Sequence, residues 1–169
     1  RGVVANLCAA DEAIPCEAQT LAFEDIYINA VSALFVSFGG AGIVMDSYGP
    51  KVTSTIGLAL FLLGSILMAL SQWTAGLVIV GIGGPPTYLS TFHWASIFQK
   101  MPHVWTGILV SGMVSSSLVY MAFGELIRAG IEPSTLFYTH AIWVAGCFAF
   151  CLVVQPSKCF SPGVRLTGL

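Results

Sequence analysis

Long uncharged, mostly apolar blocks alternate along this sequence with short charged segments. The uncharged blocks cover residues 26–45, 52–99, 101–124 and 133–157. A helix that crosses a bilayer needs roughly 20 apolar residues, so three blocks predict one helix each and the longest block predicts two. Polar residues at 71–76 predict the turn between those two helices, with Trp73 at the membrane interface, where aromatic residues gather.

These blocks predict an all-α membrane protein with five transmembrane helices. The expected spans are residues 26–46, 52–71, 76–98, 103–127 and 134–155. Strands are not expected, because no segment alternates polar and apolar residues with a period of two, as half-buried strands and membrane barrels do.

The composition narrows the class of protein further. Hydrophobic residues make up 56% of the 169 residues and charged residues only 8%, whereas a soluble domain carries about 25% charged residues. So few charges cannot cover a water-exposed surface, which excludes a soluble enzyme and a disordered chain. The formal net charge of −2 offers no basic patch, so the lipid bilayer is an expected partner and nucleic acid is not.

Lysine and arginine residues indicate the orientation of the helices. Basic residues mark the cytoplasmic side of a membrane, and they follow the first, third and fifth spans as Lys51, Lys100, Lys158 and Arg165. We therefore expect a non-cytoplasmic segment (residues 1–25), a helical half-domain (residues 26–155) and the start of a cytoplasmic linker (residues 156–169). A chain that begins at Arg1 without a signal peptide, before an odd number of helices, is also expected to be a fragment that lacks an upstream helix.

Three of the five cysteines lie outside the expected spans. A disulfide between Cys8 and Cys16 is permitted, because both residues lie in the non-cytoplasmic segment. Cys159 is expected to be a free thiol in the cytoplasmic tail.

The last span carries the other two cysteines together with a histidine and a tryptophan. Cys147 and Cys151 lie four residues apart, where small packing residues are favoured over a metal site. His140 and Trp143 are expected to be ordinary packing residues near the outer half of this helix. No metal and no cofactor is expected.

The segment from Gly42 to Lys51 is the most specific feature of the sequence. Gly42 allows close helix approach, Asp46 places a charge at the membrane edge, and Gly49 favours a tight turn. The pattern G-x-x-x-D-x-x-G-x-K resembles the signature loop of the major facilitator superfamily, which joins the second and third helices of those transporters. The resemblance implies that the five spans are helices two to six of a twelve-helix fold, and that the missing helices are partners of this chain.

Three further segments resemble solute carrier family 43, whose members are facilitative transporters of large neutral amino acids. Residues 46–51 are similar to the D-R-F-G-P-R form of the loop, and residues 86–98 fit a pattern of proline, Phe-His and phenylalanine in helix four. Residues 112–117 are similar to a helix-five segment with a glycine followed by paired serines. This resemblance implies a neutral amino acid as the substrate.

Helix breakers at residues 81–86 predict an interruption of the third span. Carbonyl groups freed by proline inside a bilayer must face protein or a water-filled cavity. The polar residues that follow either line a substrate pathway or bond to their own backbone in a packing kink. They are Tyr88, Ser90, Thr91 and His93. At the histidine, a neutral hydrogen-bonded side chain is favoured over a proton relay.

The fourth span carries polar residues with two interpretations as well. Ser115, Ser116 and Ser117 either support close helix contact, as small residues commonly do, or line the pathway. Glu125 and Arg128 lie three residues apart near the outer end of the span, which favours a local ion pair over a proton-coupling site.

The sequence supports three classes of function to different degrees. The leading hypothesis is part of a secondary transporter that moves a small solute, a neutral amino acid, by alternating access. The alternative is a non-transporting membrane module or partner subunit, because five helices alone form no pathway between two halves. An intramembrane enzyme is a remote alternative, since neither G-x-S-x-G nor H-E-x-x-H occurs, and no catalytic residue is expected.

Overall fold

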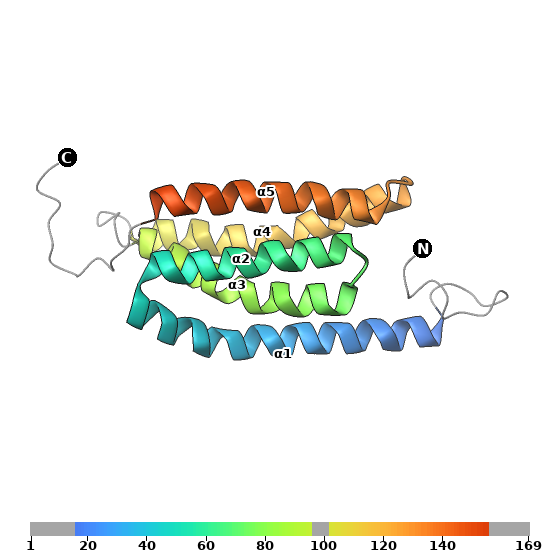
Figure 1. The fold of residues 1–169 in the computed structure, drawn as a ribbon, viewed down its shortest axis with the longest axis horizontal. Coiled ribbons are helices and arrows are strands. Elements are labelled where there is room, and N and C mark those ends of the chain that lie inside the picture. The colour runs from blue at the N-terminus through green and yellow to red at the C-terminus, as the bar shows by residue number, and fades with distance from the viewer. Residues whose placement is uncertain (1–15, 96–101, 156–169) are drawn as a thin grey trace, which may run out of the picture.

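The computed structural model describes residues 16–95 and 102–155, which form five α-helices and no strand. The helices are α1 (Glu17–Tyr48), α2 (Pro50–Ala69), α3 (Trp73–Ala95), α4 (Pro102–Arg128) and α5 (Pro133–Val154). They run alternately in opposite directions (Figure 1). The end of the bundle that carries Lys51 is therefore opposite the end that carries Cys16 and Arg128, as the charge pattern predicts.

Four of these helices are long and apolar enough to cross a membrane: α1, α2, α4 and α5. Length and composition therefore identify a multi-pass membrane protein. The remaining helix, α3, is also long enough at 23 residues, but its glycines, prolines and hydroxyl residues lower its average apolarity. The five predicted helices are present among the described residues, and four of them have the length and apolarity of a membrane span.

Helix α1 is longer than its expected span of residues 26–46. It contains 32 residues, which corresponds to about 48 Å at 1.5 Å per residue, against about 30 Å for a bilayer core. Its N-terminal end extends past the neighbouring helices (Figure 1). The helix begins earlier than predicted because residues 17–25 include good helix formers such as Glu, Ala and Leu, which continue the helix outside the apolar block.

The turn between α2 and α3 is shorter than the predicted turn at residues 71–76. Only Leu70, Ser71 and Gln72 separate the two helices, and Ser71 has a positive φ of 63°. Trp73 is the first residue of α3, and its ring meets the Phe137 ring of α5 edge-on, with the centroids 5.2 Å apart. The tryptophan thus lies at the end of the bundle and also joins a small core.

Glycines bring α3 into close contact with both neighbours, α1 and α2. A Cβ atom at Gly57 of α2 would lie 2.9 Å from the carbonyl oxygen of Gly83 in α3, and one at Gly76 of α3 would lie 2.9 Å from the carbonyl of Gly64. On the other side, a Cβ atom at Gly81 would lie 2.6 Å from a carbonyl of α1. Because no side chain larger than hydrogen fits at these points, the helix backbones touch directly.

Helix α5 packs against the other side of α2. The Ser54 hydroxyl of α2 lies 3.0 Å from the Cys151 sulfur, and Gln155 donates a hydrogen bond of 3.3 Å from Nε2 to the Ser90 carbonyl of α3. Helix α4 packs least, because no residue of its apolar window is buried. The order of packed helices is therefore α1, α3, α2, α5, with α4 attached loosely (Figure 1).

Candidate functional site

A single residue, Gly49, connects α1 to α2 at the centre of the predicted signature loop. Its backbone has φ 85° and ψ 173°, a conformation that is open almost only to glycine. Its N–H donates to the Met45 carbonyl (2.9 Å), and its carbonyl accepts from the N–H (3.2 Å) and the hydroxyl (2.9 Å) of Thr53. Thr53 is fully buried. One residue therefore ends α1 and begins α2, which holds the flanking helix ends in a defined geometry.

The two charged residues of this loop stand at unfavourable helix ends. Asp46 lies in the last turn of α1, where the helix dipole is negative, and Lys51 lies in the first turn of α2, where it is positive. Each placement costs about 0.3–1 kcal/mol at a surface. Asp46 is exposed, and neither residue forms an ion pair within residues 16–95 and 102–155. The stability of these five helices therefore does not explain the placement of Asp46, whereas Lys51 follows the first span as basic residues at one membrane side do.

Gly42, the first residue of the pattern, faces open space. No atom of another residue lies within 4 Å of the position that its Cβ would occupy. The close approach that a glycine permits here is therefore not used by the described helices. Gly39 and Gly40, on the preceding turn, are open in the same way.

The predicted interruption of α3 is absent, because the helix continues through Pro85 and Pro86. Pro86 lacks the N–H that would bond to the Ile82 carbonyl. The Ser37 hydroxyl of α1 donates to that carbonyl instead, at 2.5 Å. A side chain from a neighbouring helix thus satisfies the freed group, as is usual for proline inside membrane helices.

The predicted pathway residues Ser90 and Thr91 of α3 form hydrogen bonds within their own helix. Ser90 is buried and donates its hydroxyl hydrogen to the Thr87 carbonyl (2.7 Å), while Thr91 donates to the Tyr88 carbonyl (2.6 Å). The Tyr88 ring meets the ring of Phe92 edge-on, four residues later. The hydroxyl groups therefore bond to their own backbone, which is the packing interpretation, although each oxygen can still accept a hydrogen bond.

His93 and the α4 serines differ in their exposure. His93 is buried near the end of α3. Ser115 and Ser116 are exposed on α4, where the Ser116 hydroxyl donates to the Met113 carbonyl (2.6 Å). The side chain of Ser117 lies outside the described part of the structure. Since α4 stands away from the other helices, these serines make no close helix contact among the described residues.

The cysteines differ in their bonding. Cys16 is disulfide-bonded, and its predicted partner, Cys8, lies outside the described residues, as does Cys159. Cys147 is an exposed free thiol and Cys151 is a buried one.

Glu125 and Arg128 form the predicted local ion pair, with 2.6 Å between Oε1 and Nη1. The described residues contain no cluster of metal-ligating side chains.

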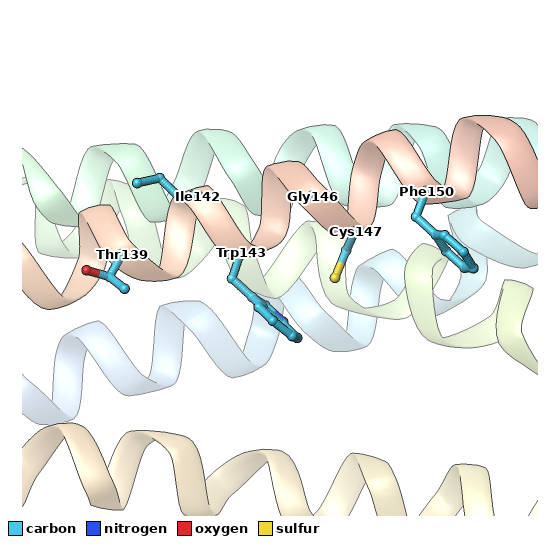
Figure 2. Close-up of a pocket in the computed structure, with 6 residues that line it drawn as sticks. All are labelled: Thr139, Ile142, Trp143, Gly146, Cys147 and Phe150. Atoms are coloured by element: carbon cyan, nitrogen blue, oxygen red, sulfur yellow. The ribbon is translucent and has the colours of Figure 1, made fainter.

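The prediction of ordinary packing for Trp143 is wrong. Its side chain is 73% exposed and lines an apolar groove of about 450 Å³ along α5. The other lining residues are Thr139, Ile142, Gly146, Cys147 and Phe150. Figure 2 shows them along α5. Their spacing of three and four residues places them on one helix face. The sequence did not indicate this groove, because a helix that is apolar on all sides does not show which of its faces a neighbouring helix covers.

Comparison with known proteins gives limited information. The chain is 26% identical over 137 residues to Protein FMP42 from Saccharomyces cerevisiae (strain ATCC 204508 / S288c), and the match covers 75% of this chain and 27% of that protein. The chain therefore spans about a quarter of the length of this relative. No protein-family model and no solved structure matches the sequence. The function of the chain accordingly rests on its residues and its geometry.

Proposed function

We propose that this chain is part of a secondary transporter that moves a small solute, a neutral amino acid, across a membrane by alternating access. In this proposal the five helices correspond to helices two to six of a major facilitator fold, with the C-terminal end in the cytoplasm. The loop from Gly42 to Lys51 then contacts the other half of the transporter in one of its two conformations.

The observation that carries the proposal is the pair of unfavourably placed charges around Gly49. Asp46 and Lys51 both oppose the helix dipoles, and Gly49 holds the two helix ends in a backbone conformation that is open almost only to glycine. A loop that served only to connect two helices would gain stability from the opposite charges. Charges that lower the stability of a fold are typical of residues that contact another part of the protein, or that do so in only one of its conformations.

Helix α3 supports the substrate part of the proposal. It lies between α1 and α2 and carries the double proline, with the hydroxyl residues Ser90 and Thr91 within the next two turns. Transporters commonly bind substrates near polar or irregular helices at the bilayer midplane. The oxygen atoms of Ser90 and Thr91 can accept hydrogen bonds from the ammonium group of an amino acid.

Uptake by the complete reading frame that encodes this chain tests the proposal. The protein is reconstituted into proteoliposomes, and uptake of radiolabelled leucine and phenylalanine is measured. We expect saturable uptake that Asp46→Asn strongly reduces, since the amide removes the charge at nearly constant volume. The matched control is Glu125→Gln, an exposed carboxylate at the other end of the bundle, which should leave uptake unchanged.

A labelling experiment tests alternating access separately from the identity of the transported solute. A cysteine placed at Thr91 is exposed to a water-soluble maleimide with and without the amino acid, and we expect the labelling rate to change when substrate binds. Absence of uptake by a protein that reaches the membrane would refute the amino-acid assignment. A labelling rate that responds to none of a panel of solutes would refute alternating access and favour a non-transporting module.

A further inference from the structure

His140 of α5 packs at the junction of α2, α4 and α5, as predicted. Its Nδ1 atom lies 3.2 Å from the Ser65 hydroxyl oxygen of α2. Its ring lies 5.9 Å from the ring of Phe61 in α2 and 5.9 Å from that of Phe123 in α4, centroid to centroid, and 6.4 Å from the ring of Tyr120 in α4. One imidazole therefore touches both helices that flank α5.

The hydrogen bonds around Ser65 determine which imidazole nitrogen carries the proton. The Ser65 hydroxyl donates its single hydrogen to the Phe61 carbonyl of its own helix, at 2.9 Å. We assign the tautomer in which the Ser65 oxygen then accepts from His140, so that Nδ1 carries the proton of the neutral ring. Nε2 is left with a free lone pair, which makes it the atom that can take up a further proton.

The groups around His140 oppose that further proton. From α2 the ring faces Phe61 and Ser65, which do not titrate near neutral pH, and from α4 it faces Phe123 and the phenol of Tyr120. No carboxylate is among its contacts in the part of the chain that the structure describes. A charged imidazolium here would have no counter-ion and would lose contact with water.

The same contacts hold α4 to the bundle. Helix α4 is exposed along its length, and Phe123 meets both His140 and Phe137 of α5 edge-on. Among the ring contacts of the described residues, Tyr120, one turn earlier, meets His140 of α5. Helix α4 also contacts α3, and Phe123 packs against the cluster of Met68, Ala69 and Phe137. The rings of Tyr120 and Phe123 thus join α4 to α5 with His140 between them.

From these observations we propose that His140 is a proton-binding site whose protonation at Nε2 loosens the contact between α4 and α5. In the neutral state the His140 ring contacts Ser65 of α2 and the rings of Tyr120 and Phe123 of α4. In the protonated state the positive charge is better solvated when α4 moves away and water reaches Nε2. The proposal concerns the bundle itself and does not depend on the transported solute.

Distance measurements between spin labels test this proposal. Labels are placed at Met121→Cys of α4 and Val36→Cys of α1, both strongly exposed, in full-length protein in nanodiscs with the free cysteines replaced by alanine. We expect the population with α4 displaced to rise as the pH falls from 8 to 5, by at most about tenfold per pH unit, the limit for one proton. A population that stays constant, or that falls on acidification, would overturn the proposal.

Two variants and one direct measurement complete the test. His140→Asn keeps a donor near the position of Nδ1 but cannot titrate, so the pH response should disappear. The matched control His103→Asn, exposed at the start of α4, should keep it. Because His140→Asn can fail to fold, ¹⁵N spectra of the three histidines in the unmodified protein give an independent result. A neutral His140 with the proton on Nε2, or one that never charges above pH 5, would contradict the assignment.

Discussion

A methyl group at Gly57 is the sharpest test of how α2 and α3 pack. The added Cβ atom would meet the Thr87 hydroxyl oxygen, would lie 2.6 Å from the Thr87 backbone nitrogen and would lie 2.9 Å from the Gly83 carbonyl oxygen. Ordinary contacts of a Cβ atom begin at 3.4 Å. Two of the three obstacles are backbone atoms, so a side-chain rotation cannot relieve them and the helices must separate by about 0.8 Å, since that is the shortfall at the nitrogen.

The magnitude follows from two opposing effects. Overpacking a close contact costs about 1–3 kcal/mol, whereas alanine favours a helix over glycine by about 1 kcal/mol. Gly57→Ala should therefore lower the free energy of unfolding by about 0–2 kcal/mol. Gly40→Ala on α1 is the matched control, because no atom of another helix lies within 4 Å of its Cβ position. That variant should be neutral or up to about 1 kcal/mol more stable.

Unfolding of the purified chain by SDS in mixed detergent micelles measures both variants. Tryptophan fluorescence can follow the transition, since Trp73 packs against Phe137 in the folded bundle. The separation between the two variants, about 1–3 kcal/mol, isolates the steric contribution. Equal transition midpoints for Gly57→Ala and Gly40→Ala would refute the direct backbone contact between α2 and α3.

Three further predictions concern single residues and use matched measurements. Ser37→Ala should lower the free energy of unfolding by about 0.6–1.7 kcal/mol, the range for hydrogen bonds between membrane helices, whereas Ser32→Ala, exposed on the same helix, should not change it. Gly49→Ala should destabilise the chain by about 1–3 kcal/mol because of its positive φ, and the open position Gly39 serves as the control in the same titration. Cys16 should react with an alkylating reagent only after reduction, and mass spectrometry that finds it labelled without reductant would contradict its disulfide.

The helices were predictable from the sequence because charges are confined to their ends. The uncharged blocks placed α2 and α5 within two residues of their observed bounds. The start of α1 was not predictable from apolarity, because residues 17–25 are helical without being apolar. The continuity of α3 depends on Ser37, 45 residues away from Ile82 along the chain. A local pattern contains no information about such a partner.

The candidate site was predictable to a smaller extent. The sequence pattern identified Gly49 as a turn residue, and its conformation agrees. The exposure of Ser115 and Ser116 was not predictable, because the sequence does not show which faces of α4 its neighbours cover. The role of His140 became visible only through Ser65, which lies on another helix. Contacts between helices, unlike helix ends, leave little trace in a sequence.

The position of α3 between α1 and α2 has a consequence for how the protein is made. A helix that contains Gly83, Gly84, Pro85 and Pro86 is a poor candidate for independent entry into a bilayer, since insertion during synthesis depends on average apolarity. Its neighbours α1 and α2 are synthesised first and are both apolar enough to enter alone. The nascent chain can therefore supply α3 with two faces to bind, and with the Ser37 hydroxyl for its free carbonyl, as it leaves the translocon. We expect α3 to enter the membrane packed against α1 and α2. Without α1, α3 would therefore remain at the membrane surface.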